Sequence, residues 1–307
     1  MTDTRIYLYD STLRDGAQTQ GVDFNVADKT AIAEALDSLG IDYVEGGWPG
    51  ANPTDDAFFA QLPRLTHSRV TAFGMTRRPG RSAANDPGLN ALFQSRAQAV
   101  CLVGKTWDFQ VDVALGIPRD ENLAVIADSI AAAKAAKGEA LFDAEHFFDG
   151  YKANPTYALA CLEAAYKAGA RWIVLCDTNG GTLVDEFKEI VARVVKEFGA
   201  DKVGVHCHND SGLGVALSLA GIAAGATLVA DDRVDLRRRR APPAGHHRGG
   251  WRVRAPGLHP GEGADAERAE AVLVLRFVAR REVQVVGAVL VGRVRRPHLL
   301  GGPRHIL

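Results

Sequence analysis

The segment Trp172-Ile173-Val174-Leu175-Cys176, followed by a helical pattern over Leu183–Phe198 and by Val203-Gly204-Val205-His206, decides the fold. Two short, nearly continuous apolar runs around an amphipathic stretch are typical of a β-α-β unit with buried, parallel strands. This unit repeats along residues 1–230. The predicted strands are Ile6–Tyr9, Tyr43–Gly46, Val70–Gly74, Ala99–Val103, Ala140–Ala144, Trp172–Cys176, Val203–His206 and Ala226–Val229. The clearest helical patterns are Val26–Leu39, Glu121–Ala136, Pro155–Ala168, Leu183–Phe198 and Leu213–Ala224.

Eight strands with seven intervening helical stretches favour a (β/α)8 barrel over an open doubly wound sheet. A dinucleotide-binding fold is disfavoured because no GxGxxG motif follows Ile6–Tyr9. We therefore predict an α/β fold, a TIM-type barrel, over residues 1–230. In such barrels the residues that perform chemistry lie at the carboxyl ends of the strands.

Length and composition describe an ordinary globular chain, with 307 residues of which 47% are hydrophobic and 24% charged. No apolar run approaches the ~20 residues that a membrane helix needs, so no membrane partner is expected. The polar start Met1–Arg5 predicts that there is no signal or transit peptide. Four widely spaced cysteines without a CxxC pair fit a reducing compartment, and we expect a cytoplasmic protein.

The last part of the chain has a different composition. Residues 1–230 carry 20 basic and 29 acidic residues, whereas residues 231–307 carry 16 arginines and 8 acids, without Ser, Thr, Asn or Lys. Three interpretations compete: an Arg-rich tail that binds nucleic acid through phosphates, a linker followed by a small β unit over Ala271–Val294, or GC-rich codons read in a wrong frame. We favour the third because no nucleic-acid-binding motif is present. We predict an aberrant Arg/Gly/Pro-rich tail that is not a native domain, and no nucleic-acid partner.

Two histidines and an aspartate predict a metal site at the barrel mouth. In His206-Cys207-His208, strand alternation puts both imidazoles on one face and Cys207 on the other, where it packs. Two imidazoles at a strand end bind one divalent ion when a carboxylate completes the set. Asp15 follows the first strand and can supply it, while the alternative is a hydrogen-bonded histidine pair. We predict that Asp15, His206 and His208 bind a divalent metal ion, with Mg²⁺, Mn²⁺ and Zn²⁺ left open.

Carboxylate and hydroxyl groups follow two further strands. Asp143 and Glu145 share a face, which makes one of them a candidate base or water-orienting group, and the alternative is a structural ion pair. Thr178 and Asn179 offer hydrogen bonds to a small polar substrate. The alternative there is a helix N-cap made by Asn179 or Thr182.

The run Asp10-Ser11-Thr12-Leu13-Arg14-Asp15-Gly16 places charged groups after the first strand, and its alternative interpretation is a capped turn with a surface ion pair. A metal ion would polarise a carbonyl, Arg14 would stabilise developing oxyanion charge, and Glu145 would manage protons. The residues alone thus predict a metal-dependent barrel enzyme acting on a small oxygenated substrate. Aldol, Claisen and lyase chemistry all fit.

Several of these segments resemble the Asp-Arg-Glu-type metallolyase barrels, which include 2-isopropylmalate, homocitrate and citramalate synthases and hydroxymethylglutaryl-CoA lyase. The segments shared across that family are Ser11-Thr12-Leu13-Arg14-Asp15-Gly16 and His206-Cys207-His208-Asn209-Asp210. The segments similar to the citramalate synthases in particular are residues 43–53 (YVEGGWPGANP), 143–151 (DAEHFFDGY) and 176–181 (CDTNGG). The resemblance covers about residues 5–229.

The resemblance implies a Claisen-type condensation of acetyl-CoA with pyruvate that gives citramalate and CoA in isoleucine biosynthesis. Acetyl-CoA and a small 2-oxo acid are the implied partners, and the family implies a homodimer. The alternatives are a related 2-oxo-acid acyltransferase, such as a 2-isopropylmalate or homocitrate synthase, and a truncated, inactive barrel that still binds metal.

The resemblance also implies roles for individual residues. Asp15, His206 and His208 would bind the metal. Arg14 would contact the oxo acid and stabilise the enolate or alkoxide, and Glu145 would be a catalytic glutamate. Thr178 would hold the substrate carboxylate.

The sequence departs from the family after Ala226-Thr227-Leu228-Val229. The family continues with an Asn-Gly-x-Gly-Glu-Arg-x-Gly-Asn segment whose last Asn lies at the metal, whereas this chain has Ala230-Asp231-Asp232-Arg233-Val234-Asp235. The family's helical subdomain, which donates a His and a Tyr to the neighbouring subunit, and its regulatory domain are not recognisable in residues 231–307. We therefore expect little or no synthase activity from the chain as written.

Overall fold

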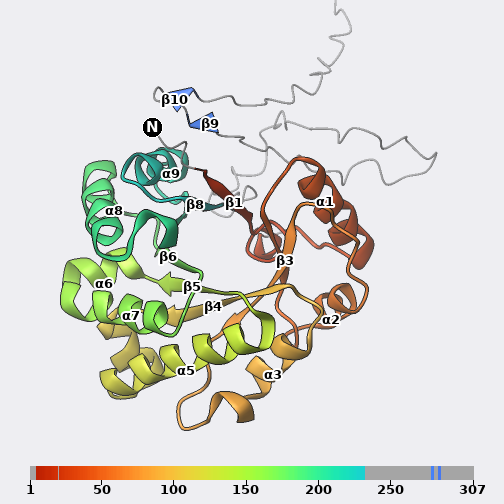
Figure 1. Ribbon diagram of the computed structural model, residues 1–307, viewed down its shortest axis with the longest axis horizontal. Helices are drawn as coiled ribbons and strands as arrows, with labels where there is room; N and C mark the ends of the chain where they lie inside the picture. Colours follow the sequence, from red (N-terminus) through yellow and green to blue (C-terminus); the bar gives the residue numbers. More distant parts are fainter. Residues whose placement is uncertain (1–4, 20, 232–277, 280–282, 285–307) are drawn as a thin grey trace, which may run out of the picture. The chain divides into compact units, whose positions relative to one another are not determined.

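The computed structural model describes residues 5–19, 21–231, 278–279 and 283–284. Eight parallel strands follow one another around a closed barrel in chain order (Figure 1). They are β1 (Tyr7–Asp10), β2 (Tyr43–Gly47), β3 (Arg69–Met75), β4 (Ala99–Lys105), β5 (Ala140–Glu145), β6 (Trp172–Asp177), β7 (Val203–Cys207) and β8 (Leu228–Asp231). The chain separates into two units, and all eight barrel strands lie in the first.

The barrel closes where β1 pairs with β8, with Tyr7 opposite Leu228 and Asp10 opposite Asp231. The predicted TIM-type barrel is therefore confirmed, and every predicted strand is present. Strands β3 and β4 are each two residues longer than predicted, and β8 lies two residues later than predicted. The extension of β4 past the predicted end at Val103 includes Lys105.

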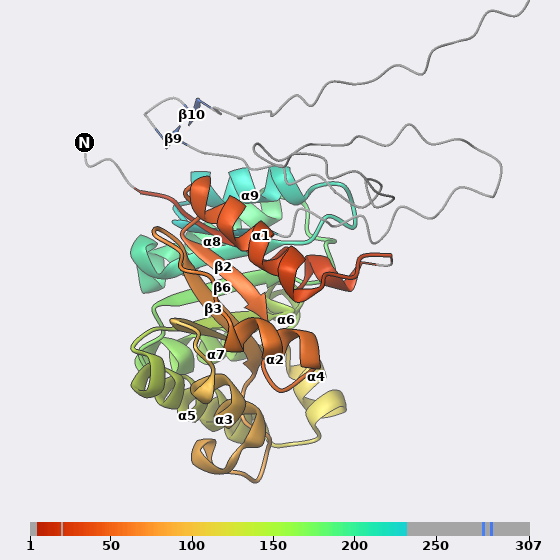
Figure 2. The same ribbon diagram turned by 90° about the vertical axis from the view of Figure 1, so that its right-hand side faces the viewer.

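Helices fill the connections between successive strands and lie around the barrel (Figures 1 and 2). They are α1 (Val26–Ser38), α2 (Pro53–Ala60), α3 (Pro87–Gln94), α4 (Asp108–Gln110), α5 (Arg119–Lys137), α6 (Phe147–Ala153), α7 (Pro155–Lys167), α8 (Val184–Phe198) and α9 (Gly214–Ala223). A π-helical turn, η3 (Val111–Leu115), follows α4.

Local sequence explains where these helices begin and which side they bury. Helices α2, α3 and α7 each start with an Asx side chain that accepts a backbone N–H, followed by proline, whose fixed φ suits the first helical position. In α8 the buried residues recur at helical spacing, so that one stripe of the helix packs on the sheet. These residues are Phe187, Ile190, Val191, Val194 and Phe198.

Large side chains fill the barrel interior, as the fold requires. Trp172 is fully buried, and its indole N–H donates to the hydroxyl of Tyr43 at 3.2 Å. Phe73 and Tyr9 belong to the same cluster, and Trp48 and Val103 pack against it. This apolar filling closes the barrel interior, so polar groups that follow the strand ends face the mouth.

Outside the barrel, β9 (Val278–Ala279) and β10 (Val283–Gln284) form a two-stranded sheet. Both strands fall within residues 271–294, the range of the small β unit that was one of the alternatives to an aberrant tail. The rest of that unit and the remainder of the predicted aberrant tail, past Asp231, lie outside the described residues. Among the residues that the structure describes, no helix is long and apolar enough to cross a membrane.

Candidate active site

The three predicted metal ligands come together at the barrel mouth. One donor atom from each of Asp15, His206 and His208 lies within 4.8 Å of the other two. The imidazole Nε2 of His208 is 3.6 Å from Asp15 Oδ2, and the two imidazole rings are 5.1 Å apart. A carboxylate with two imidazoles is a donor set that suits a divalent cation. The residues present therefore fit such an ion.

Backbone geometry explains how this set forms. His206 belongs to β7, and a tight turn after β1 places Asp15, since the N–H groups of Arg14, Asp15 and Gly16 all donate to the carbonyl of Ser11. The predicted alternation also holds at Cys207, which is buried and interacts with Ser218 of α9, outside the barrel.

Arg14 is held in a buried ion pair rather than the predicted alternative of a surface one. Its Nε donates to Glu45 Oε2 at 2.7 Å, and a terminal nitrogen lies 3.4 Å from Asp15. The guanidinium carbon stands 3.8 Å from the ring centroid of Phe73. Burial alone lowers the pKa of Arg14, but the charges of Glu45 and Asp15 raise it above its ordinary value. Arg14 therefore presents a fixed positive charge beside the metal-ligand set.

Glu45 is the partner that makes this arrangement possible. Its side chain is fully buried, and it also accepts a hydrogen bond from the Tyr9 hydroxyl at 2.6 Å. Burial raises the pKa of Glu45, whereas the positive charge of Arg14 and the Tyr9 hydrogen bond favour the ionised form. Without Arg14 this carboxylate would be an uncompensated buried charge.

A second ion pair supports the strand that carries Glu45. The Lys29 ammonium donates to the carbonyl of Gly46 at 3.0 Å and pairs with Asp55, which also accepts from the N–H of Trp48 at 2.8 Å. The pairing of β2 with β3 shifts register between Glu45 and Gly47, and Gly47 adopts a φ of +137°. A Cβ there would meet the Asp55 carboxylate at 2.5 Å, which explains the glycine in the Gly-Trp-Pro-Gly segment.

Asp143 is an acid whose proton is retained near neutral pH. It lies in β5, and burial, together with the negative charge of Glu45, raises its pKa to about 7. Its carboxylate is also close to Cys176 and His206, with donor atoms within 4.8 Å of each other. At neutral pH the site therefore holds a partly protonated carboxyl group close to His206.

Glu145 lies at the end of β5 and is paired with a residue that the sequence did not single out. Lys105 Nζ is 2.6 Å from Glu145 Oε2. Glu145 thus takes part in an ion pair at the strand ends, while its role as a catalytic group stays a prediction. Glu145 and Arg14 both influence the pKa of the buried Cys176 thiol, which places them in electrostatic range of one interior group.

Thr178 lies just past β6, next to the strand end that carries Glu145. Its hydroxyl oxygen accepts the N–H of His146 at 2.8 Å. That N–H becomes available because His146 adopts the left-handed conformation, with a φ of 55°, between β5 and α6. Because a hydroxyl group both accepts and donates, Thr178 keeps a proton that it can donate to another acceptor.

Neither Asn179 nor Thr182 caps a helix, so the alternative of a helix N-cap at these residues is wrong. Helix α8 has no side-chain cap. The Thr182 hydroxyl donates to Asp177 at 2.8 Å, and Asn179 donates to Asp149 at 2.9 Å. Both side chains fix the loop after β6 instead.

Sequence reasoning missed Glu45, Tyr9 and Lys105. A signal for Glu45 existed, because a carboxylate inside the apolar run Tyr43–Gly46 needs a buried partner. Lys105 stands two residues past the predicted end of its strand, where a lysine is ordinarily a solvated side chain.

The sequence profile of the HMGL-like family matches residues 5–231. The chain belongs to this family. It is 49% identical to the (R)-citramalate synthase of Aquifex aeolicus over 73% of the chain and 43% of that protein. Identity to the (R)-citramalate synthase of Streptomyces coelicolor is 47%, over 74% of the chain and 43% of that protein. The 2-isopropylmalate synthase of Pelotomaculum thermopropionicum is 32% identical, over 73% of the chain and 44% of that protein.

The chain thus spans less than half the length of these curated relatives. Among solved structures, the HMG-CoA lyase of Bacillus subtilis superposes with a TM-score of 0.63 at 16% identity, over 75% of this chain and 78% of that one. At that identity the likeness concerns the fold alone. The predicted resemblance to the metallolyase barrels, and to the citramalate synthases among them, is confirmed by the family match and the relatives.

Proposed function

We propose that the barrel is the catalytic domain of an acyltransferase that condenses acetyl-CoA with pyruvate to give citramalate and CoA, a reaction of isoleucine biosynthesis. The observation that carries this proposal is the difference in identity between two groups of relatives. Five (R)-citramalate synthases are 45–49% identical to the chain, whereas three 2-isopropylmalate synthases are 31–32% identical.

Asp15, His206 and His208 would hold a divalent cation, Mg²⁺, Mn²⁺ or Zn²⁺. Such an ion polarises a carbonyl when it is bound. The chain's own residues supply the remaining charge and proton chemistry. Arg14 cannot lose its proton, so it stabilises negative charge that develops on the oxo-acid oxygen.

Glu145 would remove a proton from the methyl group of the acetyl thioester, and the resulting carbanion would attack the ketone carbon of the oxo acid. The protonated Glu145 carboxyl group can then return a proton to the alkoxide, which becomes the hydroxyl group of the product. Hydrolysis of the thioester then releases CoA. Thr178 donates its hydroxyl proton to the carboxylate of the oxo acid. In this proposal Glu145 of β5, Thr178 after β6 and Arg14 after β1 act on the organic substrates, while Asp15, His206 and His208 would hold the cation.

A thiol-release assay tests the proposal. Because the chain departs from its relatives after residue 229, little turnover is expected, and the enzyme should be in excess over acetyl-CoA so that a slow rate is measurable. Pyruvate should release thiol at least about ten times faster than 2-oxoisovalerate, since an extra methylene is worth about 1–3 kcal/mol even in a pocket that discriminates weakly. Equal rates would contradict the preference for pyruvate and favour a related synthase.

The short match to the relatives favours a second candidate, a barrel that binds a cation without turnover. Elemental analysis of the purified chain distinguishes it from the first. Bound metal with no thiol release from any 2-oxo acid would support this second candidate. Salt-dependent RNA binding would instead revive the interpretation of residues 231–307 as a nucleic-acid-binding tail.

A further inference from the structure

Lys105 and Glu145 face each other across the two strands that end at the mouth. They are register partners in the β4–β5 pairing, and their charged atoms are 2.6 Å apart. The side chain of Lys105 is 16% exposed and that of Glu145 is 24% exposed. The pair is therefore shielded from water on most sides, which strengthens it relative to a surface pair.

The backbone around the pair is fixed from both sides. The carbonyl of Glu145 accepts hydrogen bonds from the N–H of Thr106 at 3.3 Å and from its hydroxyl at 2.7 Å. The carbonyl of Lys105 accepts from the side-chain amide of Asn122, a buried residue of α5, at 2.9 Å. Part-buried hydrogen bonds thus hold the backbone at both Lys105 and Glu145.

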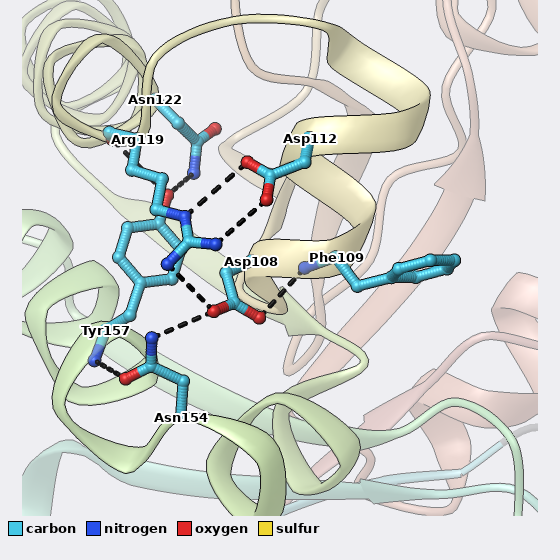
Figure 3. A network of polar contacts seen from close by, with 7 residues as sticks. All are labelled: Asp108, Phe109, Asp112, Arg119, Asn122, Asn154 and Tyr157. Atoms are coloured by element: carbon cyan, nitrogen blue, oxygen red, sulfur yellow. Dashed lines mark hydrogen bonds and ion pairs between the residues drawn. The ribbon is translucent and has the colours of Figure 1, made fainter.

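A polar network ties the segment after Lys105 to two helices (Figure 3). Asn154, the cap of α7, donates to Asp108 at 2.8 Å, and the Asn122 amide also donates to the hydroxyl of Tyr157 at 3.0 Å. Arg119 lies 3.0 Å from Asp108 and 2.8 Å from Asp112, so that it joins the start of α5 to η3. Figure 3 shows the side chains of Arg119 and Asn154 pointing toward Asp108.

A second lysine–glutamate ion pair, elsewhere on the molecule, lacks these backbone hydrogen bonds and this burial. Lys167 and Glu163 are 2.7 Å apart, nearly the same distance, but lie one turn apart on α7 with 69% and 54% of their side chains exposed. Such pairs contribute little and exchange freely with water. The fixed backbone and partial burial, rather than the distance, distinguish Lys105.

We propose that Lys105 is a positioning residue that binds one carboxylate oxygen of Glu145 and leaves the other to take the substrate proton. This inference rests on the proposed function, because it assigns Glu145 a proton to transfer. A glutamate side chain has several rotatable bonds, and a misplacement of about 1 Å can cost on the order of 10²-fold in rate. Lys105 contacts Glu145 and not the substrates.

Variants of Lys105 test this role with Lys167→Met as the matched control. Lys105→Met should lower kcat for thiol release on the order of 10²-fold and leave KM for both substrates unchanged, because only the orientation of Glu145 is lost. Lys167→Met should keep kcat. A kcat of Lys105→Met within about threefold of the parent, or a rise in KM alone, would overturn the proposal.

Chemical rescue distinguishes the effect of the ammonium charge from the effect of side-chain packing. All four native cysteines are buried, so the thiol introduced by Lys105→Cys is the accessible target for alkylation. Treatment with 2-bromoethylamine rebuilds an ammonium of nearly the original length and should restore most of kcat. Iodoacetamide adds a neutral group and should restore none. Equal rates after both reagents would contradict a charge-dependent role.

A labelling experiment keeps this inference distinct from the proposed function. Trace acetylation followed by mass spectrometry should modify Lys105 several-fold faster in Glu145→Gln than in the parent chain, with Lys167 as the internal reference. If no form of the chain releases thiol, the proposed function fails, while the labelling contrast still decides whether Lys105 holds Glu145. Unchanged labelling of Lys105 would overturn the pairing.

Discussion

The two ion pairs at the barrel mouth differ in how they are embedded. Arg14–Glu45 lies beside β1 and β2, with 11% and 0% of the side chains exposed, and is packed between Phe73 and Tyr9. Lys105–Glu145, at β4 and β5, is partly open to water. The comparison indicates that the first pair belongs to the core and cannot be removed without loss of stability. The second pair, with 16% and 24% of its side chains exposed, is expected to matter more for the orientation of Glu145 than for stability.

The largest effect is expected from breaking the buried pair. Glu45→Ala leaves the Arg14 charge buried without its partner, which typically costs about 3–5 kcal/mol. For a domain of this size the melting temperature should fall by about 10 °C, as followed by circular dichroism. Glu45→Gln, which keeps the shape of the side chain, is the matched variant. A melting temperature of Glu45→Ala within about 2 °C of the parent would show that the pair is not part of the core.

Removal of a predicted metal ligand should show whether the cation binds beside β1 and β7 or beside β5. His206→Ala should weaken the binding of a divalent cation by at least about 10²-fold, since even loss of a residue that only orients a ligand costs 10–100-fold. Titration calorimetry with Mn²⁺ or Zn²⁺ measures this. His67→Ala, which changes an exposed imidazole, should bind as the parent does. Comparable loss in Glu145→Gln would move the cation site toward β5.

The pH dependence of stability should report on Asp143, a buried carboxyl group on β5 that interacts with Glu45 and Arg14. Its pKa is about 7 in the folded chain and 3.8 ordinarily, so the folded state retains a proton that the unfolded state loses. The contribution to stability is full below about pH 4, falls as the pH rises, and is lost above pH 7. Asp143→Asn should therefore melt higher than the parent at pH 8, with the advantage shrinking toward pH 4.

Differential scanning fluorimetry in the presence of a chelator measures this difference, because a bound cation would itself change the pKa. If the difference in melting temperature between Asp143→Asn and the parent stayed constant from pH 4 to pH 8, Asp143 would titrate as an ordinary aspartate.

The smallest effect on stability is expected at the open pair. Lys105→Met should change the free energy of unfolding by less than about 1 kcal/mol, because a partly exposed pair offsets most of its attraction with desolvation and lost side-chain freedom. Urea titration measures it. A loss as large as that of Glu45→Ala would erase the difference between the two pairs and make Lys105 structural.

The same comparison shows what the sequence could reveal. The rule for barrel mouths predicted that Arg14, Asp15 and Thr178, which follow strands, lie at one mouth. Strand alternation predicted a shared face for His206 and His208 and another for Asp143 and Glu145, because periodicity fixes the face of each side chain. Periodicity does not give the partner on the next strand. Whether Lys105 stands opposite Glu145 depends on the register between β4 and β5. The sequence likewise did not show that Glu45 pairs with Arg14. The orientation of Glu45 depends on a β-bulge, which in turn depends on Lys29 and Asp55.

Closure of the barrel between Tyr7 and Leu228 has a consequence for synthesis of the chain. The first strand leaves the ribosome on the order of ten seconds or more before the strand that completes its hydrogen bonds, at about 5–20 residues per second. Throughout that interval one edge of β1 exposes unpaired backbone groups, which are a template for association with other chains. Any assistance that the nascent protein needs from chaperones should therefore end when β8 emerges.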